Sequence, residues 1–500
     1  MIRKIREVTS VVTTTFVLLS ISLSVVAQQP IVLNNKRELF VDSYLVEKLV
    51  KMEFRLGTPV SGGIALQFDA PWEGRFSGGY VSVVHDGKLF RLYYRGLGES
   101  GGALGQVTCY AESKNGIDWA KPRVGQFTVK GTLDNNVVMT GNIQQSTHNL
   151  SVMYDAKPGL LPGERFKAVG GVASSLRAAG GLYRYVSANG IHWKRYNDTT
   201  ALFPSGYGMD SQNVLAWLPE ENCYAIYLRT WSGDKPGDTT LLKGFRTIAR
   251  SVSKDFIHWS EPVRMQFGDT PVEDLYTNAT QPYFRAPHIL ISMPFRFSPQ
   301  STVLSEEEMK AYDIDRGMWK GVSDAVLLSS RGGNSYERKF LESFVRPGTD
   351  QRNWAARSTI PALGIIPTGE TEMSFFLTRA YGTKGCYLER MKLRVDGFAS
   401  LHTAYAEGFA LTRPLVLDGN TFKINYSASS IGYIKVVLLD EDGKDMPGFG
   451  HADALTLLGD KVDREVKWKS GKTIKDLGSK TIRIKFIAKD ADIYSFVISD

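Results

Sequence analysis

The sequence is poor in the residues that would mark a disulfide-rich, metal-binding or membrane-embedded protein. Only three of its 500 residues are cysteines, Cys109, Cys223 and Cys386. Their number is odd and their spacing matches no metal motif, so we expect buried free thiols and neither a metal nor another cofactor. Beyond residue 27 no apolar run reaches the ~18 residues of a transmembrane helix. The mature chain is therefore expected to have no integral membrane segment.

Charge is almost balanced, with 60 basic and 52 acidic side chains and a formal net charge of +8. No basic run is longer than a short pair, which argues against a nucleic-acid partner. The first residues, MIRKIR, are basic, and Val11–Val26 is apolar but diluted by Ser and Thr. This pattern predicts a cleaved secretory signal at residues 1–27 and a secreted or periplasmic bacterial protein. A membrane anchor is the alternative, and the polar run at residues 13–15 disfavours it.

One seven-residue motif recurs along the chain. It reads SKNGIDW at 113–119, SANGIHW at 187–193 and SKDFIHW at 253–259, with a degraded copy, SRGGNSY, at 330–336. The copies start 74, 66 and 77 residues apart, which is a long-period internal repeat. Each follows a β-type run, and its Asn-Gly, Asp-Phe or Gly-Gly pair suits the positive φ of a tight turn. About four strands closed by the same outer hairpin are typical of a propeller blade.

Three strand-like runs recur five times before residue 395, which predicts an all-β, five-bladed β-propeller. The fifth unit lacks a clean hairpin motif, so four or six blades stay open. Residues 305–312 (SEEEMKAY) are the one helical-looking stretch, and 38–48 is a strand-like segment that we expect to close the ring. From Gly397 the period ends, and short strands with glycine turns predict a C-terminal β-sandwich. The expected domains are a signal peptide at 1–27, the propeller at 28–395 and the sandwich at 396–500.

This architecture resembles the clan of glycoside hydrolase families 32, 43 and 68. RELFVDSYLV at 37–46, MDSQNVLAW at 209–217 and LYTNATQPYFRAPH at 275–288 look closer still to secreted bacterial proteins described as family-32-like. The W-x-N-D-P-N-G, R-D-P and E-C motifs of family 32 are absent. The resemblance therefore implies the fold and a carbohydrate substrate, but it carries over no catalytic residue.

Candidate catalytic residues follow from blade geometry. The starts of innermost strands, the ends of second strands and the starts of third strands share one rim, where a glycosidase would need two carboxyl groups. Asp210 opens a polar quartet before an otherwise apolar strand and is the expected nucleophile or base. Glu273 is the expected acid, because Val272 and Leu275 would desolvate it. Asp274, Asp324 and Glu73 are further candidates, and each has the competing interpretation of a carboxylate that caps backbone N–H groups.

The same rim collects arginines, whose planar fork suits a carboxylate or a sulfate. They are Arg95, Arg229, Arg296 and Arg379 at the ends of second strands, and Arg246 and Arg357 at strand starts. Repeated salt bridges between blades are the competing interpretation, whereas convergence on the axis would indicate an anionic sugar. Asn213, His288 and Trp354 complete the predicted substrate-binding set. His148 and His288 are single histidines without metal-ligand spacing and are also read as hydrogen-bonding groups.

These residues predict a secreted glycoside hydrolase that acts on an oligosaccharide or polysaccharide in an axial pocket, with paired carboxylates. Two alternatives stay open. A non-catalytic carbohydrate-binding propeller is favoured by the missing family motifs, since a fold does not imply a function. In a polysaccharide lyase, an arginine would neutralise a uronate and a tyrosine or histidine would take the proton.

Overall fold

The computed structural model describes residues 29–98, 105–140, 148–171, 181–196, 202–204, 209–233 and 244–500. The predicted signal segment lies outside these residues. The described chain is almost entirely β, and its one α-helix is α1 (Glu306–Ala311). Ser305 and Glu308 form a capping box at the start of α1, which confirms the helix predicted at this place. In the described ranges, no helix is long and apolar enough to cross a membrane.

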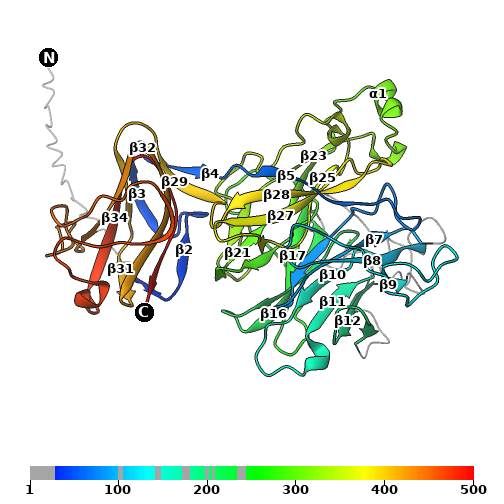
Figure 1. Ribbon diagram of the computed structural model, residues 1–500, viewed down its shortest axis with the longest axis horizontal. Coiled ribbons are helices and arrows are strands. Elements are labelled where there is room, and N and C mark those ends of the chain that lie inside the picture. The colour runs from blue at the N-terminus through cyan, green and yellow to red at the C-terminus, as the bar shows by residue number, and fades with distance from the viewer. Residues whose placement is uncertain are drawn as a thin grey trace, which may run out of the picture.

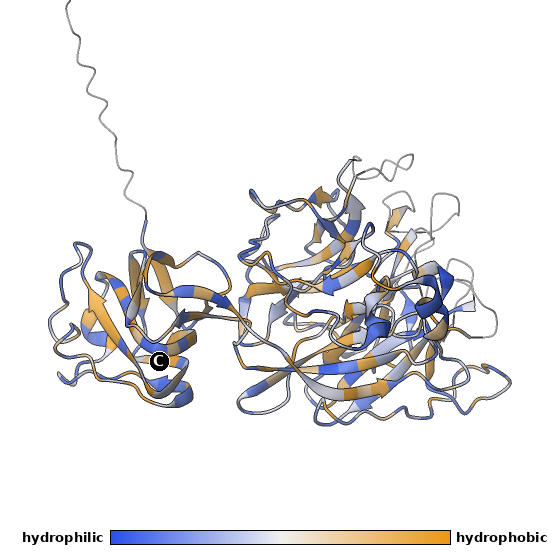
Figure 2. Ribbon diagram, turned by 90° about the horizontal axis from the view of Figure 1, so that it is seen from above, coloured by the Kyte–Doolittle hydropathy of each residue, from blue (hydrophilic) through white to orange (hydrophobic). Residues whose placement is uncertain are grey.

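Two parts are visible in Figure 1, a larger group of sheets and a smaller β unit that contains β31, β32 and β34. Seen from above in Figure 2, the two parts meet over a narrow region, and apolar and polar residues alternate along the strands. This alternation is what half-buried strands require, because successive side chains point to opposite faces.

The larger part contains five groups of antiparallel strands, which we call blades 1 to 5. Blade 1 has β6 (Ser82–His85), β7 (Phe90–Gly96), β8 (Val107–Ser113) and β9 (Val137–Thr140). Blade 2 has β10 (Ser151–Tyr154), β11 (Phe166–Gly170), β12 (Gly181–Ser187), β13 (Lys194–Arg195) and β14 (Phe203–Pro204). Blade 3 has β15 (Val214–Leu218), β16 (Cys223–Trp231), β17 (Arg246–Ser253) and β18 (Val263–Arg264).

Blade 4 is split into two three-stranded sheets. One has β19 (Asp274–Leu275), β22 (Phe295–Ser298) and β23 (Val322–Ala325), and the other has β20 (Gln281–Tyr283), β21 (Ala286–Ser292) and β24 (Leu328–Ser330). Blade 5 has β25 (Thr359–Pro361), β26 (Ile366–Pro367), β27 (Glu372–Arg379) and β28 (Tyr387–Arg394). The strand triplets that the sequence predicts are therefore found in all five groups.

The innermost strands contact one another in cyclic order, from β6 to β10, β15 and β20, and β25 contacts blade 4. Between blades 5 and 1, the N–H of Val83 donates to the carbonyl of Leu363 at 2.7 Å, and the N–H of Leu363 donates to Val81 at 2.9 Å. The arrangement is propeller-like, because the first and last blades are joined by backbone hydrogen bonds at the centre.

The ring is closed at its outer edge by β5 (Val60–Gln67), which pairs with β28 as a strand of blade 5. The expectation that residues 38–48 close the ring is wrong. Instead, β2 (Arg37–Leu39) pairs with β34 and β3 (Val46–Val50) pairs with β30. The physical reason is the apolar face of this segment, since Phe40 packs on Phe486 and Phe496 of the smaller part.

The smaller part is one ten-stranded sheet that combines both ends of the described chain. Its other strands are β1 (Ile31–Asn34), β4 (Glu53–Leu56), β29 (Ala399–Thr403), β30 (Gly408–Thr412), β31 (Leu415–Asp418), β32 (Thr421–Leu439), β33 (Asp460–Glu465) and β34 (Thr481–Ser499). The predicted boundaries are corrected here, because residues 31–56 pair with the C-terminal strands and not with the blades.

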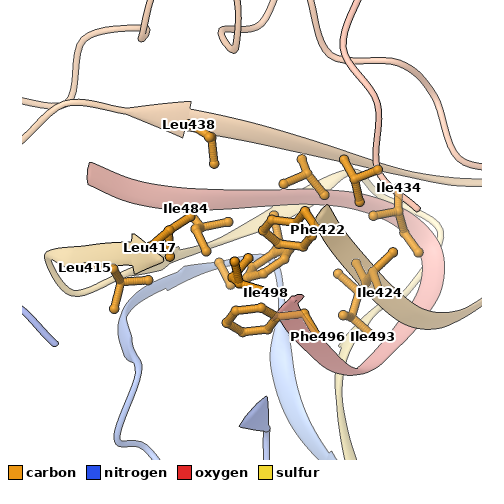
Figure 3. Packing of buried hydrophobic residues seen from close by; sticks show 14 of the residues in the cluster. Leu415, Leu417, Phe422, Ile424, Ile434, Leu438, Ile484, Ile493, Phe496 and Ile498 are labelled. Carbon is orange, nitrogen blue, oxygen red and sulfur yellow. The ribbon is translucent and has the colours of Figure 1, made fainter. Parts of the chain in front are cut away.

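The 19-residue strands β32 and β34 pair along most of their length around the core in Figure 3, in which Phe422, Ile424 and Phe496 are buried. The polar residues 489–492 (KDAD) suggest a turn, but the chain does not reverse there. The strand continues there with Asp490 at φ 44°, opposite a register shift in β32. A single left-handed residue is enough to make a bulge, so the polar residues that suggest a turn need not reverse the chain.

The repeated hairpin motif forms the same hydrogen bonds in blades 1, 2 and 3. The first serine accepts from the backbone N–H of Asn115, Asn189 or Asp255, and the side chain of that Asn or Asp accepts from the isoleucine two residues later. Phe256 takes φ 68° where the other copies have glycine. Trp193 of blade 2 packs edge-on against Tyr93 of blade 1 at 5.9 Å. The predicted repeat is confirmed, and its tryptophan packs between neighbouring blades.

Replacing Trp193 by alanine should lower stability by roughly 2–4 kcal/mol, because truncating a buried aromatic leaves a cavity and this indole is half-buried. The expected result is a lower midpoint of thermal unfolding, followed by circular dichroism. Leu133→Ala is the control, since Leu133 is 54% exposed and a surface change stays within about 0.5 kcal/mol. Equal midpoints for the two variants would contradict a stabilising role for the packing of Trp193 between blades 1 and 2.

Candidate functional site

Asp210 lies just before β15, and its side chain is 41% exposed. One carboxylate oxygen is 3.1 Å from Nε2 of His148, which precedes β10 of the next blade. The other ring nitrogen, Nδ1, is 2.8 Å from the side-chain amide of Gln106. Asp210 and His148 thus come from two neighbouring blades and are held together by a hydrogen bond.

Burial and hydrogen bonding shift the pKa values of Asp210 and His148 in opposite directions. Burial raises the pKa of Asp210, but the hydrogen bond from His148 and the charges of Arg229 and Arg95 outweigh it and set the pKa at about 2. Burial lowers the pKa of His148, and the charge of Arg95 lowers it further. At neutral pH, Asp210 is therefore a carboxylate, and His148 is a neutral ring that donates its Nε2–H to it.

Arginines gather around the ring of Tyr276, which lies between β19 and β20. The guanidinium groups of Arg246, Arg229 and Arg357 are 4.8, 5.3 and 6.0 Å from the centre of this ring. Arg246 also pairs with Asp274 at 3.0 Å. Three arginines from blades 3 and 5 thus surround one tyrosine of blade 4, within the range of cation–π attraction.

Arg95, at the end of β7, completes the group on the side of blade 1. Its guanidinium lies 5.1 Å from the ring of Tyr80 and donates to the side-chain oxygen of Asn149 and to the hydroxyl of Tyr381. These partners are neutral, and Arg95 is buried. We call the whole set the axial cluster; it comprises Tyr80, Arg95, His148, Asn149, Asp210, Arg229, Tyr276, Arg357 and Tyr381.

Gln212 and Asn213 hold the turn that carries Asp210. The amide of Gln212 donates to the Tyr80 carbonyl at 3.1 Å and to Oγ of Ser82 at 3.0 Å, which joins blade 3 to blade 1 across the ring. Asn213 donates to two backbone carbonyls of its own turn and accepts from the backbone N–H of Arg229. This buried amide spends its hydrogen bonds on the backbone, and its predicted role in binding substrate stays a prediction.

Left-handed residues recur at the starts of the innermost strands. Tyr80, Asn149, Ala279 and Arg357 have φ values of 62°, 57°, 43° and 60°, and each stands two residues before the first residue of its strand. For a residue other than glycine, this conformation costs about 1–3 kcal/mol. Three of the four carry side chains of the axial cluster. The sequence analysis missed Asn149, Gln106 and Tyr381, since it considered mainly acids and arginines at the rim.

Besides Asp274, which pairs with Arg246, three more of the predicted carboxylates are engaged in ion pairs. Glu73 is buried, accepts from the hydroxyl of Tyr94 and pairs with Lys121 at 2.7 Å. Arg296 binds Asp324 through two hydrogen bonds of 2.9 and 2.6 Å and Glu273 through one of 3.2 Å.

A second guanidinium, that of Arg338, also binds Glu273. Val272 is 66% exposed, so it does not desolvate this carboxyl group. The expectation of a desolvated acid at Glu273 is therefore corrected. Arg296 is a salt-bridge residue instead of a substrate ligand, and Arg379 likewise pairs with Glu389 at 2.6 Å. Pairing of Asp210 with a second carboxyl group stays a prediction.

Two more predicted ligands have other partners. Nε2 of His288 lies 3.1 Å from Glu38 of β2, at the contact between the two parts of the molecule. Its expected place in the substrate site is wrong, because His288 and Arg331 both pair with the buried Glu38. These pairs connect the first strands of the chain to blade 4. Trp354 is half-buried, donates to the carbonyl of Gly348 at 2.8 Å and precedes Arg357 by three residues. Its contact with substrate stays a prediction.

The cysteines confirm the expectation from the sequence, since Cys109, Cys223 and Cys386 are buried and free. Among the described residues, no group of three or more His, Cys, Asp or Glu side chains could hold a metal ion.

No protein-family model and no curated protein matches the sequence. Solved structures with a similar arrangement include a glycoside hydrolase, at 10% identity over 66% of this chain and 91% of that one, with a TM-score of 0.39. A GH32 β-fructofuranosidase of Bombyx mori matches at 10% identity over 86% and 93%, with a TM-score of 0.39. An exo-β-1,3-galactanase of Phanerochaete chrysosporium matches at 10% identity over 88% and 99%, with a TM-score of 0.38. No residue role is transferred from these proteins.

The lowered pKa of Asp210 predicts how this residue affects stability in acid. A carboxyl group with a depressed pKa stabilises the fold above its unfolded pKa near 4, and this contribution disappears as the pH falls towards about 2. The thermal midpoints of the wild type and Asp210→Asn should therefore differ most above pH ~4 and converge in stronger acid. Replacing His148 by Gln removes the hydrogen bond that lowers the pKa of Asp210. The stability that the Asp210 carboxylate contributes should therefore be lost at a higher pH in His148→Gln than in the wild type. Parallel curves for all three proteins would contradict the pairing.

Proposed function

We propose that the protein is an exported carbohydrate-active enzyme, a five-bladed β-propeller joined to a β-sandwich, that hydrolyses glycosidic bonds at the axial cluster. The observation that carries this proposal is Asp210, an ionised and partly exposed carboxylate held by His148 among residues from all five blades. A glycosidase needs such a carboxylate beside the bond that it cleaves.

A pKa of about 2 favours one of the two roles expected for Asp210. A general base works best when its pKa lies near the working pH, so this carboxylate is a weak base. As a nucleophile, or as a fixed negative charge, it would instead stabilise the positive charge that develops on the sugar ring in the transition state. His148 would fix the direction of the carboxylate through its Nε2–H.

A polysaccharide lyase is the second candidate, and the tyrosine hydroxyls beside Arg357 favour it. A base would take the proton next to the carboxylate of a uronic acid, and the C–H electron pair would form a double bond in the sugar. The glycosidic C–O bond would break, and its oxygen would leave with the bonding pair and take up a proton. Arg357 would neutralise the uronate, and the hydroxyls of Tyr80 and Tyr381 lie in the same cluster. A protein that only binds saccharides is the remaining alternative.

Asp210→Asn separates these possibilities on a panel of neutral and acidic polysaccharides. In a hydrolase, the variant should lose activity roughly a thousandfold or more, because the carboxylate acts on the transition state, while saccharide binding remains. New reducing ends without ultraviolet absorbance identify hydrolysis, whereas an absorbing, unsaturated sugar identifies a lyase.

Asp442→Asn is the matched control, since Asp442 lies on an exposed turn with its side chain 78% exposed. Binding without either product would replace the enzymatic proposal by the binding function. Unchanged turnover in Asp210→Asn would remove this residue from the mechanism.

Asn213→Ala should lower kcat by roughly ten- to a hundredfold and leave KM nearly unchanged. The alanine removes the amide that fixes the turn of Asp210, and small displacements of a catalytic group are costly. Steady-state kinetics on the best substrate of the panel checks this expectation. A rise in KM alone would instead support the original assignment of Asn213 as a substrate ligand.

A further inference from the structure

Arg357 differs from most other arginines of the rim in its partners. Three of the others pair with carboxylates, as Arg246–Asp274, Arg296–Asp324 and Arg379–Glu389. In the described part of the chain, no carboxylate pairs with Arg357. Its guanidinium donates only to the carbonyl of Gly317, at 3.4 Å, and its backbone N–H donates to Oγ of Ser323.

The backbone holds Arg357 at the centre of the ring at an energetic cost. Its φ of 60° is left-handed, and its side chain is half-buried beside the ring of Tyr276. The charge of Asp210 and the hydroxyls of Tyr276, Tyr80 and Tyr381 act on this guanidinium. Strain of this kind persists where the surrounding structure enforces it, and it is concentrated at ligand sites.

The local charge around Arg357 is also unbalanced. Arg95 lies in the same cluster with the neutral partners Asn149 and Tyr381, and it acts on Asp210 as well. Two guanidinium groups without a carboxylate hydrogen bond thus face one carboxylate, Asp210, which is hydrogen-bonded to His148. Holding a partly desolvated cation without a paired anion is costly, and an anionic ligand group would relieve that cost.

We propose that Arg357 is an anion-binding subsite that holds a carboxylate or sulfate group of the saccharide on which Asp210 acts. The planar guanidinium can bind such a group through two parallel hydrogen bonds. Arg95, which is buried and already engaged, contributes positive potential without touching the ligand. Asp210 repels an anion, so the acidic group lies on the Arg357 side, away from the bond that is cleaved. The inference that the ligand is a saccharide rests on the proposed function, whereas the inference that Arg357 binds an anion does not.

Binding is measured by calorimetry in the Asp210→Asn background, so that the ligand stays intact. The probes are digalacturonic acid, its neutral methyl ester and a sulfated carrageenan disaccharide, which carries sulfate but no carboxylate. Arg357→Gln should weaken binding of the acidic probe by roughly ten- to a hundredfold, because a charged hydrogen bond is lost. Arg357→Lys should give an intermediate loss, since it keeps the charge but not the fork. The ester should bind weakly and equally to all variants.

Arg123→Gln is the matched control, because Arg123 is 82% exposed and pairs only with Asp134 at the surface. The two acidic probes identify the anionic group. Tighter binding of the uronate indicates a carboxylate ligand, and tighter binding of the sulfated sugar indicates a sulfate ligand. Weak binding of both acidic probes, or equal affinity for acid and ester, would overturn the proposal. If Arg357→Gln does not fold, the wild-type salt dependence decides, since only binding of the acid should weaken as ionic strength rises.

The two proposals fail in different ways. If Arg357→Gln binds the acidic probe unchanged while Asp210→Asn abolishes cleavage, the subsite is wrong and the enzymatic function stands. If acidic probes bind through Arg357 while Asp210→Asn leaves turnover unchanged, the subsite stands and the role of Asp210 falls.

Discussion

Closure of the ring is the constraint on which the rest of the structure depends. At the centre, the N–H of Val83 donates to Leu363 and the N–H of Leu363 donates to Val81, which joins the first and last blades. At the edge, β5 completes blade 5 beside β28. The residues of the axial cluster lie at or near strand ends, and together they come from all five blades. Asp210 of blade 3 therefore meets Arg95 of blade 1 and Arg357 of blade 5 only when the ring is closed.

A second constraint links the ring to the smaller sheet. Asp396 is fully buried and left-handed, at φ 64°, and it accepts hydrogen bonds from Tyr283, Arg285, Arg37 and Ser495. These partners belong to blade 4, to the first strands of the chain and to its last strand. Removing one partner of a buried charge leaves it uncompensated, which is more costly than losing a surface pair. The junction thus fixes both ends of the chain beside the ring without taking part in the axial cluster.

The arginines of the rim show how similar sequence positions acquire different roles. Arg296 and Arg95 both lie near the end of a second strand, yet Arg296 binds two carboxylates and Arg95 binds an amide and a phenol. The difference arises from the neighbouring strands, which bring Asp324 and Glu273 to one arginine and Asn149 and Tyr381 to the other. An arginine of the rim is left without a carboxylate partner when the neighbouring strands supply no acid.

The sequence by itself determined the repeat, the all-β character, the strand triplets of the five blades and the place of Asp210 just before an innermost strand. These features are local, because turn chemistry at the hairpins and alternation along a strand need only neighbouring residues. Tertiary structure alone decided which polar residues meet. Glu273, Asp324 and His288 resemble site residues in the sequence, but salt bridges to residues distant in the chain occupy them. Asn149 and Tyr381 carry no local signal, and ring closure brings them to Arg95 because hydrogen bonds depend on distance in space and not along the chain.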